Sequence, residues 1–551
     1  MHQGTPSKLA GSNTVSNKYA EDRLAAERWL SQESDSHEAM ARLCQLADQS
    51  QDYPHAADWL CRSLEKHPDH HRACAHLGYV MCRLDQWEAG LECYDKAIAI
   101  NAGQPMYFYE RAAALAHLDR HARALPDYER ALALDPGFAN AYAHYGTSLA
   151  CLGQQAPALA AFDRAIALDQ RCTAAWVNRA NAYLKNQAFA SALADYDRAI
   201  ALQPGHAIAH ANRGAALKHL HRIDEALAAT DRAIALDPGY ADAQFNKALL
   251  LLLKGELREG FRLYQVRWQT KAFAPILRGF QPPLWLGEEN IAGKRLLVHN
   301  EQGLGDSIQF SRFVTLAARL GAQVIYEVEP ALFDLFGSLE GVHTLVQQRQ
   351  MLPPFDLYCP VMTLPAALGT TLADLSIGGP YLQAPAERRA QWARRLGDRA
   401  GLRVGLVWSG NPLHQGDAQR SIALQDLSQA LPQGLQCFSL QKELREGDAQ
   451  FIASSGQLRH FGAELVDFSD TAALCSHMDL VIAVDTSVAH LAGALGIETC
   501  LLLPFTPDWR WLLHRHDSPW YPRMHLFRQE ASGDWTAVLH RIGALLEQRT
   551  R

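Results

Sequence analysis

The chain has 551 residues, of which 48% are hydrophobic, 9% aromatic and 20% charged, and its formal net charge is −7. At roughly 150 residues per domain this length predicts three or four folding units, which excludes a single small module. The composition is that of a globular protein and argues against wholesale disorder. A slightly acidic chain without a long basic run also lacks the electrostatics of a nucleic-acid-binding protein.

Cysteine usage and hydropathy point to a cytoplasmic protein. The 11 cysteines are scattered and none forms a C-x-x-C pair with the spacing of metal ligands, which favours reduced thiols. Residues 1–20 hold no apolar core of a signal peptide, and the longest aliphatic run lies near residues 248–253. We therefore expect no transmembrane segment and no metal ion.

An internal repeat of 34 residues fills the first half of the chain. A 34-residue period is typical of tetratricopeptide (TPR) helix pairs. We count about six and a half repeats over residues 37–270, preceded by a tail and a capping helix over 1–36. The motif A-[IL]-A-[IL]-[DNQ] ends at Asn101, Asp135, Asp169, Gln203 and Asp237. Prolines that would end the second helix of a pair are Pro68, Pro136, Pro204 and Pro238.

Two columns of small residues and one of aromatic residues recur in the repeats, as close packing of paired helices requires. The small residues include Gly78, Ala112, Gly146, Ala180, Gly214 and Ala248 in the first helices and Gly90, Ala124, Ala158, Ala192 and Ala226 in the second. The aromatic residues are Tyr94, Tyr128, Phe162 and Tyr196.

Three asparagines follow the repeat on the predicted inner helices. Asn178, Asn212 and Asn246 are 34 residues apart, so their amides would project in register and could bind a peptide backbone. The column resembles the asparagine ladder of the protein O-GlcNAc transferases, which implies an acceptor-binding groove. The alternative is that Asn is simply common at this repeat position. Earlier positions of the column hold His76, Glu110 and His144.

The repeat pattern ends near residue 270, and a different fold begins near 294. Residues 271–293 are rich in Pro, Gly and Trp and predict a packed linker. Beyond it strands and helices alternate, which predicts two doubly wound α/β lobes over 294–390 and 400–551. Predicted strands lie at 295–301, 323–328, 403–408, 436–440, 480–485 and 499–503, with a helix at 307–320.

The first candidate site is the segment 302–307, between a predicted strand and a helix. Backbone N–H groups and the helix dipole favour anions at such a point, and Gly303 and Gly305 would let a ligand approach the backbone. Ile308 stands where a dinucleotide fingerprint needs its third glycine, so that fingerprint fails. Asp306 is either a catalytic carboxylate or merely the N-cap of the helix.

The second candidate follows the predicted strand at 480–485. Thr486 and His490 are four residues apart and Ser487 and His490 three, so these side chains share one face of a first helical turn. With Asp485 they would surround a bound phosphate. A Ser–His nucleophile is the weaker interpretation because no G-x-S-x-G is present. The structural alternative is a capped helix with a surface histidine.

Two further loops follow predicted strands. In the segment 408–422, Arg420 can fork onto a diphosphate, while Asn411 and His414 either contact the ligand or only shape the turn. The segment 507–521 mixes aromatic and charged residues, which could line a sugar or base pocket or simply pack between the lobes.

At this point the residues resemble a known family. The strand, G-D loop and helix at 295–320, together with V-D-T-S-V-A-H-L-A-G-A-L-G at 484–496, resemble the paired motifs of glycosyltransferase family 9, the ADP-heptose:lipopolysaccharide heptosyltransferases of GT-B fold. The whole chain resembles bacterial TPR–glycosyltransferase fusion proteins. The resemblance implies two Rossmann-like lobes, with the acceptor bound by the first and the nucleotide sugar by the second. Ser487 departs from the glycine that heptosyltransferases often carry, which leaves the donor sugar open.

The resemblance also implies roles for individual residues. Asp306 would be the base, and Arg420 would hold the phosphates of the nucleotide-diphosphate sugar, which is a co-substrate; no cofactor is expected. The only D-x-D, Asp195-Tyr196-Asp197, lies in a repeat helix, which favours metal-independent inverting transfer. The predicted donor-binding residues are Gly303, Gly305, Asn411, His414, Arg420, Ser421, Asp485, Thr486, Ser487 and His490.

Three functions compete. The first is a glycosyltransferase that modifies a protein or peptide presented by the TPR groove. The second is a heptosyltransferase-like enzyme with lipopolysaccharide or another glycan as acceptor. The third is a TPR interaction scaffold whose transferase module is inactive.

Overall fold

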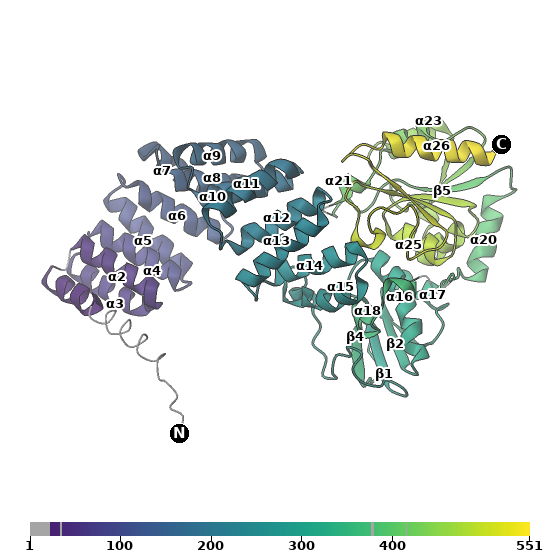
Figure 1. The fold of residues 1–551 in the computed structure, drawn as a ribbon, viewed down its shortest axis with the longest axis horizontal. Coiled ribbons are helices and arrows are strands. Elements are labelled where there is room, and N and C mark those ends of the chain that lie inside the picture. The colour runs from purple at the N-terminus through teal and green to yellow at the C-terminus, as the bar shows by residue number, and fades with distance from the viewer. Residues whose placement is uncertain (1–21, 34–35, 376–378, 415, 551) are drawn as a thin grey trace, which may run out of the picture. The chain divides into compact units, whose positions relative to one another are not determined.

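The computed structural model describes residues 22–33, 36–375, 379–414 and 416–550. The chain divides into two compact units, Met1–Ala216 and Leu217–Arg551. Figure 1 shows helices alone in the first and helices followed by two parallel sheets in the second. The predicted tail over 1–20 lies outside the described residues, and the predicted capping helix is present over 22–32.

The first unit is a succession of antiparallel helix pairs, as the 34-residue period predicts. A residue of the [DNQ] position ends each second helix and turns the chain: the side chains of Asn101 and Asp135 accept hydrogen bonds from the backbone N–H groups of Gly103 and Gly137 at 3.0 and 2.9 Å. The helices are α2 (His37–Ser50), α3 (Tyr53–Lys66), α4 (His71–Arg83), α5 (Trp87–Ile100), α6 (Pro105–His117), α7 (His121–Leu134), α8 (Ala139–Cys151), α9 (Gln155–Leu168), α10 (Thr173–Lys185), α11 (Phe189–Leu202) and α12 (Ala207–His219), the last of which runs into the second unit.

The small-residue columns are contact points between helices, as predicted. A Cβ atom at Gly78 would lie 3.0 Å from the ring of Tyr94, and one at Gly146 would lie 2.7 Å from the ring of Phe162. These distances are shorter than ordinary van der Waals contact, so the aromatic residue of each second helix packs directly on the small residue of the first.

Ion pairs between helices accompany this packing. Arg179 donates to Asp195 at 2.7 Å and to Asp163 at 2.6 Å, and Arg213 donates to Asp197 at 2.6 Å. The D-x-D sequence therefore serves the solenoid structurally and is placed as predicted, in helix α11.

The second unit begins with the last helices of the solenoid: α13 (Ile223–Leu236), α14 (Ala241–Lys254), α15 (Leu257–Tyr264), η1 (Gln265–Gln269) and η2 (Ala274–Ile276). A fully buried guanidinium joins them to the α/β part. Arg267 is 0% exposed and donates to both carboxylate oxygens of Glu301, at 2.9 and 3.1 Å, and to Thr363 at 2.8 Å. Its guanidinium also lies over the ring of Trp268, 4.2 Å from the centroid.

The first lobe is a four-stranded parallel sheet with strand order β3-β2-β1-β4. Its strands are β1 (Arg295–His299), β2 (Gln323–Val328), β3 (Val342–Gln347) and β4 (Leu357–Pro360). Its helices are α16 (Leu304–Arg319), η3 (Pro330–Leu332), α17 (Phe333–Phe336), η4 (Val361–Thr363), α18 (Leu364–Ala367) and α19 (Leu372–Leu375). The next helix, α20 (Ala386–Leu396), contacts the second lobe, where the indole of Trp392 donates to Asp470 at 3.3 Å.

The second lobe is a six-stranded parallel sheet with strand order β10-β9-β8-β5-β6-β7. Its strands are β5 (Arg403–Val407), β6 (Gln436–Ser439), β7 (Leu458–His460), β8 (Leu480–Val484), β9 (Thr499–Leu503) and β10 (Met524–Arg528). Its helices are α21 (Asp417–Arg420), α22 (Leu424–Gln429), α23 (Asp448–Ser455), η5 (Gly462–Glu464), α24 (Phe468–Cys475), α25 (Ser487–Ala494), η6 (Trp509–Trp511) and α26 (Thr536–Thr550).

The six predicted strands are all present, whereas β3, β4, β7 and β10 were not predicted. The predicted helix at 307–320 begins three residues earlier, at Leu304, and its N-cap is Gly303. Asp306 is therefore not the N-cap itself. As the third residue of the helix it accepts the N–H of the N-cap Gly303 at 3.0 Å, so its carboxylate does have the helix-capping role of the structural alternative.

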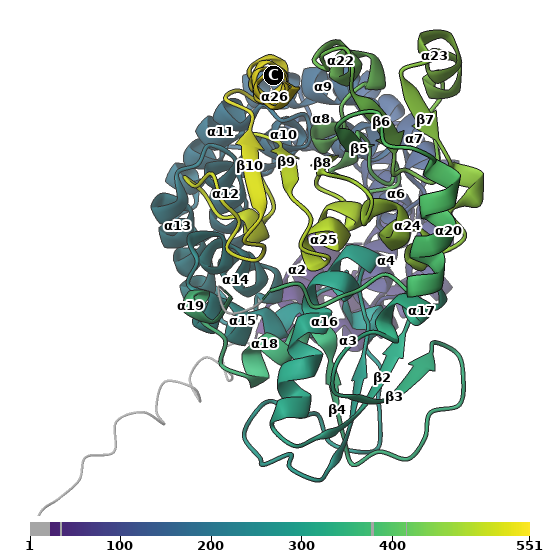
Figure 2. The ribbon, with the colours of Figure 1, turned by 90° about the vertical axis from the view of Figure 1, so that its right-hand side faces the viewer.

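Helices α16 and α25 pack against each other between the two sheets (Figure 2). Gly305 makes this approach possible: a Cβ atom there would lie 3.1 Å from the ring of His490. Arg312 of α16 also donates to the carbonyl of Trp520 at 2.9 Å. The two lobes therefore meet at the helix that follows β1 in the first lobe and the helix that follows β8 in the second.

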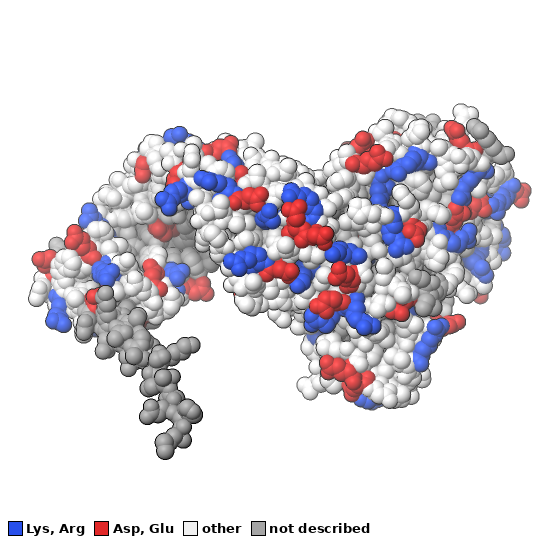
Figure 3. All heavy atoms as spheres, viewed as in Figure 1, with Lys and Arg blue, Asp and Glu red and all other residues white. Residues whose placement is uncertain are grey.

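No helix among the described residues is both long and apolar enough to span a membrane. On the face drawn in Figure 3, the described acidic and basic side chains are interspersed.

Candidate functional site

A cavity of about 1390 Å³ opens in the second unit, where the strands of both sheets end. Because the carboxyl ends of parallel strands lie at one edge of a sheet, the loops after β1, β5 and β8 all reach it. The end of α12 and the helix α14 complete its lining through Lys218, His219, Leu249 and Leu253.

Most of the predicted site residues line this one cavity. They are Gly303, Gly305, Asp306, Asn411, His414, Arg420, Asp485, Thr486, Ser487 and His490. Ser421 is not among the lining residues; its hydroxyl instead bonds to Asp417 at 3.1 Å and accepts the N–H of Gly410 at 3.2 Å.

Asp306 is the carboxylate at the start of α16. It accepts a hydrogen bond from the N–H of Gly303 at 3.0 Å and forms an ion pair with Arg510. Burial raises the pKa of Asp306 above its usual range, and the neighbouring guanidinium opposes that shift without cancelling it. A carboxylate with a raised pKa accepts protons more readily than an ordinary aspartate.

Arg510 fixes this carboxylate from the opposite lobe. Its guanidinium donates to Gln309 at 2.7 Å and to Asp508 at 2.8 Å, and it lies over the ring of Trp509, 4.4 Å from the centroid. Burial alone would raise the pKa of Asp508, but Arg510 outweighs burial and the pKa lies below its usual range. The two carboxylates that share Arg510 therefore differ in basicity, and Asp306 is the better base.

Asp485 and His490 form a buried group beside α25. Asp485 accepts a hydrogen bond from the indole of Trp511 at 2.9 Å, and burial raises the pKa of Asp485 to about 6. Nδ1 of His490 lies 3.1 Å from the hydroxyl of Tyr521. Burial lowers the pKa of His490 to about 3, so its imidazole is neutral. The surface-histidine alternative is wrong, because His490 is 5% exposed.

The N-terminus of α25 borders the cavity through Thr486, Ser487 and Val488. The hydroxyl of Thr486 is buried and bonds to none of the residues that the structure describes. A helix N-terminus with an unsatisfied hydroxyl is a favourable place for an oxygen-rich anion.

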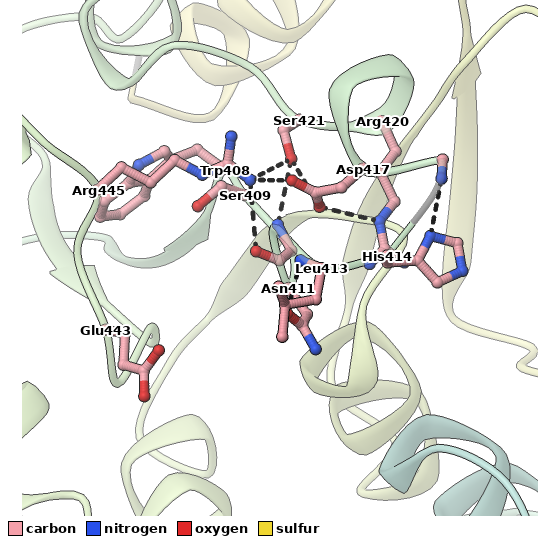
Figure 4. Close-up of polar contacts among 12 residues, drawn as sticks. Trp408, Ser409, Asn411, Leu413, His414, Asp417, Arg420, Ser421, Glu443 and Arg445 are labelled. Atoms are coloured by element: carbon pink, nitrogen blue, oxygen red, sulfur yellow. Dashed lines mark hydrogen bonds and ion pairs between the residues drawn. The ribbon is translucent and has the colours of Figure 1, made fainter. Parts of the chain in front are cut away.

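Two arginines share one carboxylate at the far side of the cavity (Figure 4). Asp417, 4% exposed, pairs with Arg420 at 3.4 Å and with Arg445. Arg420 also donates to the carbonyl of Asp485 at 2.7 Å, and Arg445 donates to Ser421 at 3.0 Å. One negative charge thus holds two positive ones, and both guanidiniums line the cavity.

The loop that carries these groups is held rigidly. The side-chain oxygen of Gln441 accepts the N–H groups of Trp408 and Ser409 at 2.7 and 2.9 Å. The side chains of Asn411 and His414 accept backbone N–H groups two residues further on, at 3.0 and 3.1 Å. Asn411 and His414 therefore shape the turn, as the alternative predicted, and they also line the cavity.

The aromatic segment 507–521 divides in two. Trp511, Trp520 and Tyr521 are buried at 0%, 1% and 1% exposure, so the packing interpretation is correct for them. Asp508 and Arg510 line the cavity.

The predicted acceptor asparagines lie in the solenoid helices. Asn178 donates to Thr147 at 3.0 Å, and Asn212 donates to Asn181 at 2.9 Å. Asn246 lies in α14 and is not among the residues that line the cavity. The proposed role of these amides in binding a peptide stays a prediction.

Sequence reasoning missed four residues of the site: Lys218, Gln441, Arg445 and Arg510 as the partner of Asp306. Arg445 and Gln441 follow β6 and belong to none of the motifs. Within the described part of the chain, no cluster of three His, Cys, Asp or Glu side chains is arranged to hold a metal ion.

Comparison with known proteins identifies the repeats. Residues 173–206 and 212–266 match the tetratricopeptide repeat family. The 34-residue units are therefore tetratricopeptide repeats, which suggests protein or peptide partners.

Protein FlbA of Caulobacter vibrioides is 26% identical over 329 residues, which cover 54% of this chain and 54% of FlbA. The chain thus matches about half the length of this curated relative. Among solved structures, YrrB, described as a TPR protein with an unusual peptide-binding site, is 22% identical, with a TM-score of 0.29, over 35% of this chain and 100% of YrrB. The pilF protein of Pseudomonas aeruginosa is 20% identical, with a TM-score of 0.35, over 38% of this chain and 96% of pilF.

Proposed function

We propose that the second unit is a glycosyltransferase of the GT-B type, which moves a sugar from a nucleotide-diphosphate donor to an acceptor. The observation that carries the proposal is that one cavity holds both a carboxylate of raised pKa, Asp306, and a separate pair of arginines on a shared carboxylate, Arg420 and Arg445. The first suits a general base and the second suits a diphosphate.

The reaction would be a single inverting displacement. An acceptor hydroxyl would attack the anomeric carbon while Asp306 takes its proton, and the bond from that carbon to the diphosphate oxygen would break. Arg420, Arg445 and the N-terminus of α25 would stabilise the negative charge of the leaving diphosphate. These fixed positive groups would supply the stabilisation that a metal ion gives in other transferases, so we propose metal-independent transfer.

The solenoid suggests the acceptor. Tetratricopeptide repeats bind protein segments, so we propose a protein or peptide acceptor, and the asparagines at 178, 212 and 246 are the candidate contacts. A lipopolysaccharide or other glycan acceptor remains the second candidate, and a scaffold without turnover the third; both fit the TPR matches equally well.

The full chain should release nucleoside diphosphate from one member of a panel of ADP-, UDP- and GDP-linked sugars, with a protein acceptor or slowly with water. Asp306→Asn removes the base and should lower this rate about 100- to 10,000-fold. Asp334→Asn is the matched control, because Asp334 is exposed and lies outside the cavity. A folded Asp306→Asn protein that keeps the wild-type rate would overturn the assignment of the base.

A further inference from the structure

One cation in the cavity has no partner within the described protein. Four of the five Lys and Arg side chains that line the cavity are bonded: Arg420 and Arg445 to Asp417, Lys442 to the carbonyl of Val466 at 3.1 Å, and Arg510 to Asp306 and Asp508. The ammonium group of the fifth, Lys218, makes no hydrogen bond or ion pair with any residue that the structure describes.

Lys218 is held in place by its neighbours. The carbonyl of His219 accepts the hydroxyl of Thr506 at 3.5 Å, and the ring of His221 stacks on Phe505 with centroids 4.2 Å apart. These contacts fasten the end of α12 to the loop 505–508. Lys218 is therefore a half-buried lysine on a fixed backbone, and it lines the same cavity as the apolar Leu249 and Leu253.

The carboxylate of Asp508 does not neutralise the charge of Lys218. Asp508 is the only acid that acts electrostatically on Lys218 among the described groups, and it is already bonded to Arg510 at 2.8 Å. Burial lowers the pKa of Lys218, and Asp508 offsets this only in part. A cation that is desolvated without a bonded partner is costly, unless a ligand completes it.

The repeat itself shows that this lysine is not part of the solenoid's packing pattern. Its position in the 34-residue repeat is occupied by Asp48 in α2 and by apolar residues in five other helices. The apolar residues are Cys82, Ala116, Ala150, Leu184 and Leu252. Lys218 is therefore the only basic residue at this position among the described repeats, and Asp48, the other charged one, is hydrogen-bonded to Tyr53 and Tyr79 within the solenoid.

We propose that Lys218 determines specificity by binding a carboxylate of a substrate, at the end of the cavity that Asp508 and Arg510 connect to Asp306. This inference rests on the proposed function. Arg420 and Arg445 are assigned to the diphosphate, so Lys218 binds a second negative group, carried either by the transferred sugar or by the acceptor. Leu249 and Leu253 leave the rest of that ligand an apolar wall.

The test uses the full chain with its lysines reductively dimethylated with ¹³C, which keeps their charge. The Lys218 signal is assigned by its loss in Lys218→Arg. Two matched pairs of probes distinguish the sources: glucuronate with glucose, and N-acetylaspartate α-amide with N-acetylasparagine α-amide. The Lys218 signal should shift with the anionic member of at least one pair and not with its neutral partner, while the Lys442 signal stays. Equal responses to both members, or none at millimolar concentration, would overturn the proposal.

Affinity gives the second measurement. Lys218→Met should reduce the preference for the bound anionic probe over its neutral partner by about 10- to 100-fold. Lys442→Met is the matched control, because that lysine also lines the cavity but is already bonded. Binding of UDP, ADP or GDP should be unchanged by Lys218→Met. If the wild-type protein bound none of the three nucleotides, the proposed function would fail. If Lys218→Met kept the wild-type preference for the anionic probe, only the role of Lys218 would fail.

Discussion

Charged side chains are arranged differently in the solenoid and in the cavity. In the solenoid, a guanidinium is matched by carboxylates 16 residues away along the chain, as Arg111 is by Asp95 and Asp127. In the cavity, Arg510 is shared by two carboxylates of unequal basicity, and Arg420 and Arg445 share one. Lys218 is bonded to no carboxylate that the structure describes. Arginines that are fully paired with carboxylates stabilise the repeats, whereas cations in the cavity that are incompletely paired are available to bind a negatively charged ligand.

The largest expected effect concerns the buried pair that joins the solenoid end to the first lobe. Arg267→Met leaves Glu301 buried, 2% exposed and without its cation, so the free energy of unfolding should fall by about 3–5 kcal/mol. Urea denaturation followed by tryptophan fluorescence measures it. The double variant Arg267→Met, Glu301→Leu should recover most of the loss. A fall of less than about 1 kcal/mol in the single variant would mean that this pair resembles the exposed ones.

Asp485→Asn should stabilise the protein, which no solenoid pair would do. Burial raises the pKa of Asp485 to about 6, so the ionised form is unfavourable in the folded state. Its stabilising contribution is present below the unfolded pKa of 3.8 and is lost as the pH rises through 6. The variant should therefore gain on the order of 3 kcal/mol at about pH 8 and little at about pH 3, seen as a higher Tm at the higher pH only. The same gain at both values would contradict the assigned pKa.

Arg179→Met should have a smaller effect. Arg179 contacts Asp195, whose side chain is 7% exposed, and losing this partly buried pair should cost about 2 kcal/mol. The loss should disappear in the double variant with Asp195→Leu. A cost that persists there would show that the methionine itself packs poorly.

Arg213→Met should have the smallest effect. Its partner Asp197 is 51% exposed, so the cost should be about 0.5 kcal/mol and should shrink further in high salt. Thermal unfolding at low and high ionic strength measures both. A loss of unfolding free energy equal to that in Arg179→Met would show that the exposure of the carboxylate does not determine how much each ion pair stabilises the protein.

The sequence predicts central strands better than edge strands. The six predicted strands lie in the interior of the sheets, and the four missed ones, β3, β4, β7 and β10, are the four edges. A central parallel strand is buried on both faces and reads as a continuous apolar run. An edge strand is shorter or alternates: β7 has three residues, and β10 exposes His525 between buried Met524 and Leu526.

The residues of the candidate site likewise differ in how well the sequence predicts them. Asp306, Arg420 and the group at 485–490 stand directly after predicted strands, so topology alone brings them to one edge. Arg510 lies in the segment 507–521, which follows a predicted strand and has the composition of a pocket lining, but its pairing with Asp306 depends on a tertiary contact across the lobes. Arg445 reaches the cavity through contacts between loops, for which the sequence holds no local signal. Lys218 carries a local signal, because it is the only basic residue at a repeat position that is apolar elsewhere except at Asp48.

The most direct test is calorimetric titration of the full chain with ADP, UDP and GDP. At least one should bind, and Arg420→Met and Arg445→Met should each weaken it about 10- to 100-fold, because each removes a charge-assisted hydrogen bond to phosphate. Arg395→Met, which removes an exposed arginine outside the cavity, should leave the affinity unchanged. Absence of binding by all three nucleotides, or binding indifferent to Arg420 and Arg445, would contradict the account.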